Sequence, residues 1–182
     1  MLTETFSIHG TSVWLATATE EENALSLQQQ QHTALQLLAA AGYNPHDLCH
    51  TPEGCPYLNR SAAPFISIAH TQRMVAFALS DKPLGIDVEA IAPRTLRVMP
   101  RIISKREKET LHLNEDIATA TRIWCTKEAV FKAYSTKATA ITDVNIVQLN
   151  DIKATTSTPY SSEVFFKEYH AHIVALALTA TP

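Results

Sequence analysis

Three apolar segments follow one another closely in the middle of the sequence, and this spacing constrains the fold more than any other feature. Residues 65–70 and 73–80 predict two strands joined by a tight connection, and residues 81–83 (Asp-Lys-Pro) break the chain before a third strand at 84–91. Connections this short can join antiparallel strands, whereas parallel strands need a crossover of about a dozen residues or more. This region therefore predicts antiparallel sheet.

The rest of the chain mixes helices with further strands. A hairpin is expected at residues 5–18 around Gly10, and a helix is expected to begin near the glutamates at 20–22 and to end at Gly42. The later elements are two helices and two strand regions, at 104–113, 118–134, 141–149 and 163–179. The predicted class is α+β with antiparallel strands.

A weak internal repeat suggests how the chain is divided. Residues 75–80 (Val-Ala-Phe-Ala-Leu-Ser) are echoed by residues 174–179 (Val-Ala-Leu-Ala-Leu-Thr). The echo fits two similar halves that meet near Pro83, residues 1–83 and 84–182, each ending in an equivalent strand.

Charge is distributed unevenly along the chain. The first 59 residues contain six acidic residues and no lysine or arginine, so the 15 basic residues all lie from Arg60 onward, where 12 acids leave a formal charge of +3. This asymmetry indicates an anionic ligand or partner handled mainly by the later part of the chain. It argues against nucleic acid, because the positive field is weak and no basic stretch is interleaved with aromatic residues.

Cysteine usage and hydropathy indicate a cytoplasmic protein. Cys49, Cys55 and Cys125 have neither the spacing of a disulfide framework nor that of a zinc site, so they are interpreted as structural. No apolar run approaches the ~20 residues that a membrane span needs, and the N-terminus does not have the pattern of a signal peptide. No membrane association is expected.

Two carboxylates lie two positions apart in the third predicted strand. Because side chains alternate along a strand, Asp87 and Glu89 should project from one face about 7 Å apart, while Ile86 and Val88 point to the core. Such a pair suits a hard divalent cation such as Mg²⁺. The alternative for this pattern alone is an ordinary solvated strand face.

The helix predicted at 118–134 carries an unusual group of charges. Helical spacing places Lys127 inside an apolar arc, with Glu128 and Lys132 beside it at positions i and i+4. An ordinary helical ion pair and a lysine reaching out from the edge of the core would also explain the pattern. A cation within the apolar arc beside a carboxylate is better suited to meeting an anion and a metal.

Together these segments resemble the paired signature of a known family, the 4′-phosphopantetheinyl transferases of the surfactin-synthetase-activating type. The signature is Gly-Ile-Asp-Val-Glu at residues 85–89 followed by Trp-x-x-Lys-Glu-Ala-x-x-Lys at 124–132. Residues 54–58 resemble the family's Gly-Lys-Pro segment, and residues 65–71 resemble its Ile-Ser-x-Ser-His-Ser strand. The likeness covers roughly residues 54–141.

The resemblance implies a fold and a reaction. The fold is the α+β phosphopantetheinyl transferase fold, with two similar halves related by pseudo-twofold symmetry and the site in the cleft between them. The reaction moves the 4′-phosphopantetheine group of coenzyme A to a serine of an apo acyl or peptidyl carrier protein and releases 3′,5′-ADP, as in a holo-acyl-carrier-protein synthase. Magnesium is the implied cofactor, and a monomer is expected because one chain holds both halves.

The resemblance also assigns roles to individual residues. It makes three carboxylates the magnesium ligands, Asp87, Glu89 and Glu128. It makes three basic residues the coenzyme A contacts, His70, Lys127 and Lys132. It assigns catalysis to Glu107, Glu128 and Lys132. Magnesium bound there would neutralise charge on the phosphoryl oxygens while 3′,5′-ADP leaves.

Glu107 has two interpretations that do not exclude each other. Ser104 and Glu107 have the spacing of a capping box, which accounts for both residues without catalysis. The family also carries a glutamate near this place that is proposed as the general base.

The sequence departs from the family pattern at the nucleotide-binding positions. Cys55 stands where the family has lysine, and Ala-His-Thr at 69–71 replaces Ser-His-Ser. The helix of the first half has no basic residue, although family members usually reach the ribose 3′-phosphate with lysine or arginine from that half. Arg60 and Arg73 are the candidates to compensate.

Other functions stay open beside the transferase. One is a non-catalytic relative that binds carrier protein or coenzyme A, and the other is a magnesium-dependent phosphohydrolase that uses the same carboxylates. The densest basic stretch is either an ordinary solvated surface or the surface that meets an acidic carrier protein. It comprises Arg94, Arg97, Arg101, Lys105, Arg106 and Lys108.

Overall fold

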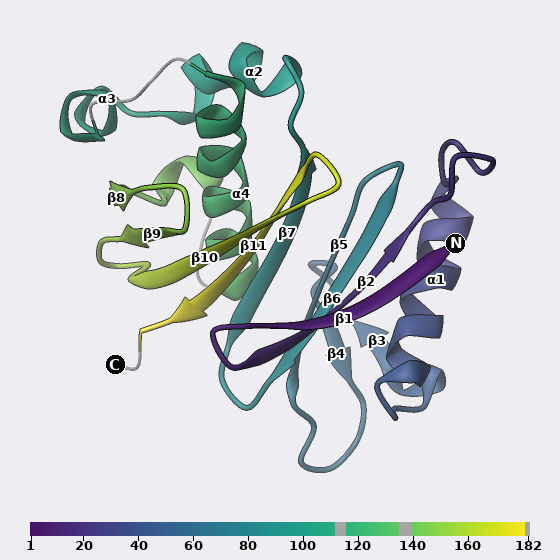
Figure 1. The fold of residues 1–182 in the computed structure, drawn as a ribbon. Coiled ribbons are helices and arrows are strands. Elements are labelled where there is room, and N and C mark those ends of the chain that lie inside the picture. The colour runs from purple at the N-terminus through teal and green to yellow at the C-terminus, as the bar shows by residue number, and fades with distance from the viewer. Residues whose placement is uncertain (112–115, 135–139, 181–182) are drawn as a thin grey trace.

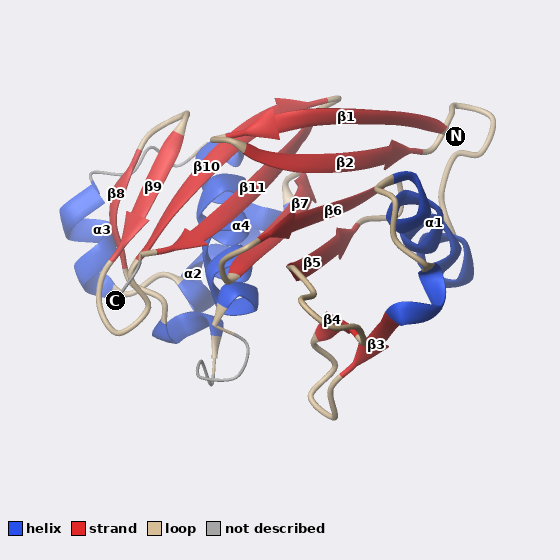
Figure 2. Cartoon of the chain, turned by 90° about the horizontal axis from the view of Figure 1, so that it is seen from below, coloured by secondary structure: helices blue, strands red, loops and turns tan. Residues whose placement is uncertain are grey.

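Two antiparallel sheets pack against each other, and helices cover the outer face of each (Figures 1 and 2). The structure is a computed structural model that describes residues 1–111, 116–134 and 140–180. The predicted α+β class with antiparallel strands is confirmed, since every strand pair in these ranges is antiparallel.

The chain passes from one sheet to the other at residues 81–83. The first sheet has the order β1-β2-β6-β5 and comprises β1 (Leu2–Ile8), β2 (Thr11–Thr17), β6 (Met74–Ser80) and β5 (Phe65–His70). The second has the order β7-β11-β10-β9-β8 and comprises β7 (Leu84–Ala90), β11 (His172–Thr179), β10 (Ser162–Tyr169), β9 (Lys153–Thr156) and β8 (Ile146–Leu149). The echoed segments therefore lie in β6 and β11, which are both inner strands of their sheets.

Helices surround this pair of sheets on two sides. Their bounds are α1 (Leu27–Ala40), α2 (Arg94–Ile102), α3 (Lys105–Leu111) and α4 (Ile117–Ala133), with short 3₁₀ turns η1 (Pro45–Asp47) and η2 (Ile141–Asp143). Helix α1 packs on the outer face of the first sheet, and α4 packs on β7 and β11 of the second (Figure 1). A small hairpin of β3 (Leu48–His50) and β4 (Pro56–Leu58) follows α1.

The alternation in β7 determines what each of its faces contacts. Leu84, Ile86 and Val88 are buried in the core between the two sheets, together with Val174 and Leu176 of β11. The intervening residues of β7 therefore face α4. This strand is the element that joins the central core to the helix carrying the second half of the sequence signature.

The predicted start of α1 is wrong. The helix begins after Ser26, whose side chain accepts from Gln29 N while the Gln29 side chain accepts from Ser26 N, forming a capping box. The glutamates at 20–22 lie before the helix, where Glu22 accepts from Thr19 N at 2.8 Å. The expected stop is confirmed, because Gly42 follows the helix with φ +86°.

Other elements agree in part with the sequence pattern. The hairpin at 5–18, the strand region at 163–179 and the helix at 118–134 are confirmed within a few residues. In 141–149 only residues 146–149 form a strand. The predicted end of the helix at 104–113 falls outside the described residues. Three elements were not predicted, α2, β9 and the β3–β4 hairpin; α2 contains Pro100, which interrupts a helical pattern.

Candidate functional site

Gly85 lets α4 approach β7 unusually closely. A Cβ atom at this position would lie 1.9 Å from the carbonyl oxygen of Ala129 and 2.7 Å from the nitrogen of Ala133. A strand residue with any side chain would therefore displace the helix. The glycine of the Gly-Ile-Asp-Val-Glu segment brings the last turns of α4 against the carboxylates that follow it.

Asp87 lies in this contact and is 5% exposed. Its Oδ1 accepts from Lys132 Nζ at 2.8 Å, and Lys132 also donates to the carbonyl oxygen of Ile86 at 3.1 Å. Its Oδ2 is buried and has no hydrogen-bond partner among the described residues. The interpretation of a solvated strand face is thus wrong for Asp87, because α4 covers that face.

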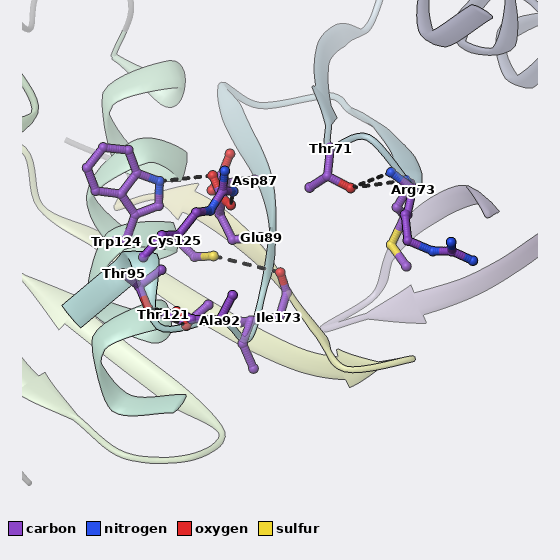
Figure 3. A network of polar contacts seen from close by, with 12 residues as sticks. Thr71, Arg73, Asp87, Glu89, Ala92, Thr95, Thr121, Trp124, Cys125 and Ile173 are labelled. Atoms are coloured by element: carbon purple, nitrogen blue, oxygen red, sulfur yellow. Dashed lines mark hydrogen bonds and ion pairs between the residues drawn. The ribbon is translucent and has the colours of Figure 1, made fainter. Parts of the chain in front are cut away.

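Glu89 lies at the open end of the same face and is held by two side chains. Trp124 Nε1 of α4 donates to Glu89 Oε1 at 3.1 Å, and Arg94 at the start of α2 forms an ion pair with Oε2 (Figure 3 shows Trp124 and Glu89 pointing toward each other). Burial and the nearby charge of Asp87 raise the pKa of Glu89, and Arg94 opposes this rise.

Glu128 completes the group from α4, one turn before Lys132. Burial raises its pKa, and so does the charge of Asp87, whereas Lys132 lowers it. Burial alone would lower the pKa of Lys132, but Asp87 raises it above its ordinary value. The three carboxylates are therefore close enough for Asp87 to hinder the ionisation of the other two.

The chemistry of this group fits a divalent cation. The set consists of hard oxygen donors, one buried carboxylate oxygen has no partner, and Asp87 raises the pKa values of Glu89 and Glu128. Over the described ranges, however, no three Asp, Glu, His or Cys side chains are gathered at metal-binding distances. Lys132 and Arg94 instead balance part of the negative charge.

His70 lies at the exposed end of β5, in the first sheet. Partial burial lowers its pKa, and the positive charge of Lys132 adds to this effect, while Asp87 opposes it. His70 thus shares the electrostatic environment of Lys132 and Asp87 although it comes from the other sheet.

Lys127 and Glu107 form an ion pair with each other. Among the described residues, neither is bonded to Asp87, Glu89 or Glu128. Lys127 is fully buried and donates to Glu107 Oε1 at 2.7 Å and to the carbonyl oxygen of Val144. Glu107 is 2% exposed, and its Oε1 also accepts from Ile146 N at 2.9 Å. Lys127 therefore has no surface accessible to a ligand in this structure.

The capping box of Glu107 is confirmed. Glu107 Oε2 accepts from Ser104 N at 2.8 Å, and Glu107 N donates to Ser104 Oγ at 3.1 Å. Burial would raise the pKa of Glu107, but hydrogen bonds from Ile146, Lys127 and Ser104 hold it below its ordinary value. Burial lowers the pKa of Lys127 against the effect of the Glu107 charge.

A cavity of about 990 Å³ opens beside Lys132, and its walls come from segments before and after the connection between the sheets at 81–83. Its walls come from residues within 51–66, from the connection at 82–84, and from residues within 132–134, 158–161 and 179–180. Lys132 lies in the wall, so the residue that contacts Asp87 also faces the cavity. The cavity could not be found from sequence, since its walls are distant along the chain.

The sequence pattern also did not predict the two contacts of Glu89, with Trp124 and with Arg94. Trp124 belongs to the recognised signature, but nothing in its spacing shows that its indole reaches Glu89. The sequence pattern places Arg94 only in the basic stretch.

No helix in the described part of the chain is long and apolar enough to cross a membrane.

The family model of the 4′-phosphopantetheinyl transferase superfamily matches residues 83–179, which include β7 and α4. A 4′-phosphopantetheinyl transferase of Bacillus subtilis is 29% identical to this chain over 82 residues, which are 43% of this chain and 37% of that protein. The similarity thus spans well under half of the relative's length. Because the family match covers more than half of this chain, the protein belongs to the 4′-phosphopantetheinyl transferase superfamily.

Proposed function

We propose that this protein transfers the 4′-phosphopantetheine group of coenzyme A to a serine of an apo carrier protein, as a transferase of the surfactin-synthetase-activating type. The observation that carries the proposal is the position of Lys132, which contacts Asp87 and also lines the cavity between the halves. A donor bound in the cavity would have its phosphates beside the lysine and next to the carboxylates. Membership of the superfamily supports the same reaction class.

Asp87, Glu89 and Glu128 are the proposed magnesium ligands. The partnerless oxygen of Asp87 supports this assignment, as do the raised pKa values of the two glutamates. Bound magnesium would neutralise charge on the diphosphate as 3′,5′-ADP leaves. The ion would compete with Lys132 for Asp87 and with Arg94 for Glu89.

Lys132 and His70 are the proposed contacts to the coenzyme A phosphates. Asp87 raises the pKa of Lys132, which keeps the ammonium charged beside a phosphate. The lowered pKa of His70 keeps its ring neutral near pH 7, so it would donate a hydrogen bond rather than a full charge.

Glu128 is the proposed acceptor of the serine proton. Burial raises its pKa in the metal-free protein, and a carboxylate oxygen that the magnesium leaves free would accept the proton. Glu107 has a lowered pKa and three hydrogen-bond donors on its two oxygens, so we propose a structural role for Glu107 and Lys127. This assignment replaces a direct contact of Lys127 with coenzyme A.

The remaining proposals concern the whole molecule. The change of sheet at 81–83 supports two halves, 1–83 and 84–182, and the inner positions of β6 and β11 support a pseudo-twofold relation between them. A cavity with walls from both halves of one chain supports an active monomer. The three cysteines are free, which fits a reducing cytoplasm.

One experiment separates the transferase from its alternatives. The protein is incubated with coenzyme A, magnesium and a panel of apo acyl and peptidyl carrier proteins, and carrier mass is measured. We expect a gain of one phosphopantetheine group on at least one carrier. Release of 3′,5′-ADP without any carrier would indicate a phosphohydrolase, and binding of coenzyme A without a mass gain would indicate a non-catalytic relative.

A further inference from the structure

The cavity between the halves has aromatic and apolar walls. Tyr57 and Phe65 of the first half line it and are 43% and 49% exposed, and Tyr134 lines it from the end of α4. Its volume of about 990 Å³ is at the upper end of the range for small-molecule sites. Exposed aromatic rings in such a cavity suit a planar base, because aromatic side chains stack on bases whatever their identity.

The charges in the cavity walls are all positive. Among the described lining residues, Lys82 and Lys132 are charged and none is acidic. Lys132 is bound to Asp87, whereas Lys82 Nζ forms no ion pair or hydrogen bond within the described ranges. Lys82 is therefore an exposed cation that faces the cavity and is free to bind an anion.

The two arginines expected to compensate for the missing basic residues of the first half are engaged elsewhere. Arg73 donates through its guanidinium to the carbonyl oxygens of Asn23 and Ala18. Arg60 lies over the ring of Tyr43, with its guanidinium carbon 5.4 Å from the ring centroid. Neither lines the cavity.

We infer that Lys82 binds the 3′-phosphate of a nucleotide whose base lies against the aromatic wall of the cavity. The diphosphate of the same ligand would lie toward Lys132, so the two lysines would hold the two anionic parts of one molecule. This inference rests on the proposed function and adds the residue that recognises the 3′-phosphate. Residues 1–59 contain no lysine or arginine. Lys82, in the connection between the sheets, would supply the missing cation.

The test compares two nucleotides that differ only in the 3′-phosphate. Binding of 3′,5′-ADP and 5′-AMP is measured by titration calorimetry for the wild type, Lys82→Ala and Lys82→Arg. Lys153→Ala is the control, because Lys153 lies in β9, outside the basic stretch, and is not in the cavity wall. We expect Lys82→Ala to weaken 3′,5′-ADP about tenfold, leave 5′-AMP unchanged and be rescued by Lys82→Arg.

The outcomes separate this inference from the proposed function. Equal affinity of the wild type and Lys82→Ala for 3′,5′-ADP overturns the assignment of Lys82 and leaves the transferase proposal intact. Equal weakening of both nucleotides also overturns it, because a phosphate contact discriminates between them. A wild type that binds neither coenzyme A nor 3′,5′-ADP would contradict the proposed function as well.

Discussion

Asp87 and Glu107 are both buried carboxylates paired with a lysine, yet their surroundings differ. Both oxygens of Glu107 accept hydrogen bonds, whereas one oxygen of Asp87 has no partner among the described residues. A fully satisfied carboxylate stabilises the fold, whereas a partly satisfied one is available to a ligand. The two residues should therefore respond differently to the same substitution.

Asp87→Asn should remove magnesium binding while leaving the fold intact. Magnesium should raise the Tm of the wild type, because a ligand at a hundredfold excess over its Kd stabilises the folded state by ~2.7 kcal/mol. The variant removes the ion-pair partner of Lys132, but it relieves the repulsion on Glu89 and Glu128 and leaves Lys132 near the Glu128 carboxylate. Its unfolding free energy without metal should therefore fall by less than the ~3 kcal/mol expected for breaking the buried pair of Glu107. Thermal unfolding with and without magnesium measures both effects, and an unchanged magnesium shift would refute the ligand assignment.

Glu107→Gln should destabilise the protein by about 3 kcal/mol, because it breaks a buried ion pair. A capping box alone needs one side-chain oxygen, but Glu107 uses Oε2 for Ser104 and Oε1 for both Lys127 and Ile146. An amide cannot replace both oxygens, and it leaves the Lys127 charge unpaired.

The control for this change is the double variant Glu107→Gln with Lys127→Met. Removing the unpaired charge should recover a large part of the lost stability in chemical denaturation. Stability unchanged in Glu107→Gln together with a loss of turnover would instead favour the general base.

The same residue gives a pH dependence with a defined sign. The folded pKa of Glu107 lies below its ordinary value of 4.5. Its contribution to stability is therefore fully present above pH 4.5 and is lost as the pH falls through the lower folded pKa. Urea unfolding between pH 7 and 3 should show this loss in the wild type and a shallower decline in Glu107→Gln. Parallel pH profiles of the two proteins would show that the Glu107 carboxylate does not make this contribution to stability.

At the scale of elements, the contact of α4 with β7 assembles the carboxylate group. Lys132 reaches Asp87 and Trp124 reaches Glu89 only because Gly85 allows the helix to approach the strand. A substitution that weakens the contact of α4 with β7 should therefore also change the geometry of the site.

Gly85→Ala should cost about 1–3 kcal/mol, because the added methyl group overpacks the contact with Ala129. It should also reduce the stabilisation by magnesium, since α4 carries Glu128 and must move away from β7. Ala90→Val on the same strand is the control and should change stability less, as Ala90 is only partly buried. A magnesium shift of wild-type size in Gly85→Ala would show that the site tolerates displacement of the helix.

At the scale of the whole molecule, six of the 15 basic residues lie in the stretch 94–108, in and beside α2 and α3. All six side chains of the basic stretch are exposed, and Arg94 among them is paired with Glu89. Lys105 Nζ lies 3.9 Å from Glu109 Oε1 in an exposed pair. The other four, Arg97, Arg101, Arg106 and Lys108, are available to meet an acidic carrier protein, as we propose.

The apparent KM for carrier should rise with salt, while kcat changes little, because exposed charge pairs are screened. Arg97→Glu with Arg101→Glu should raise KM at low salt and reduce its salt dependence. Lys153→Glu serves as the control, because Lys153 lies in β9, outside this stretch. A KM independent of salt would contradict docking at this face.

The sequence by itself determined the local pattern of the site. Alternation placed Asp87 and Glu89 in one strand, helical spacing placed Lys127 in an apolar arc, and the spacing of Ser104 and Glu107 predicted the capping box that the structure shows. These are relations between near neighbours, which strand and helix geometry fix without reference to the rest of the chain.

Tertiary packing alone decided which of these faces is covered and by what. Alternation cannot show that α4 covers Asp87, because both faces of β7 are buried, one by the first sheet and one by the helix. The partner of Lys127 lies 20 residues earlier in α3, and the cavity joins segments that lie before and after residue 83 in the chain. Such contacts depend on how elements dock, which a pattern along one element does not specify.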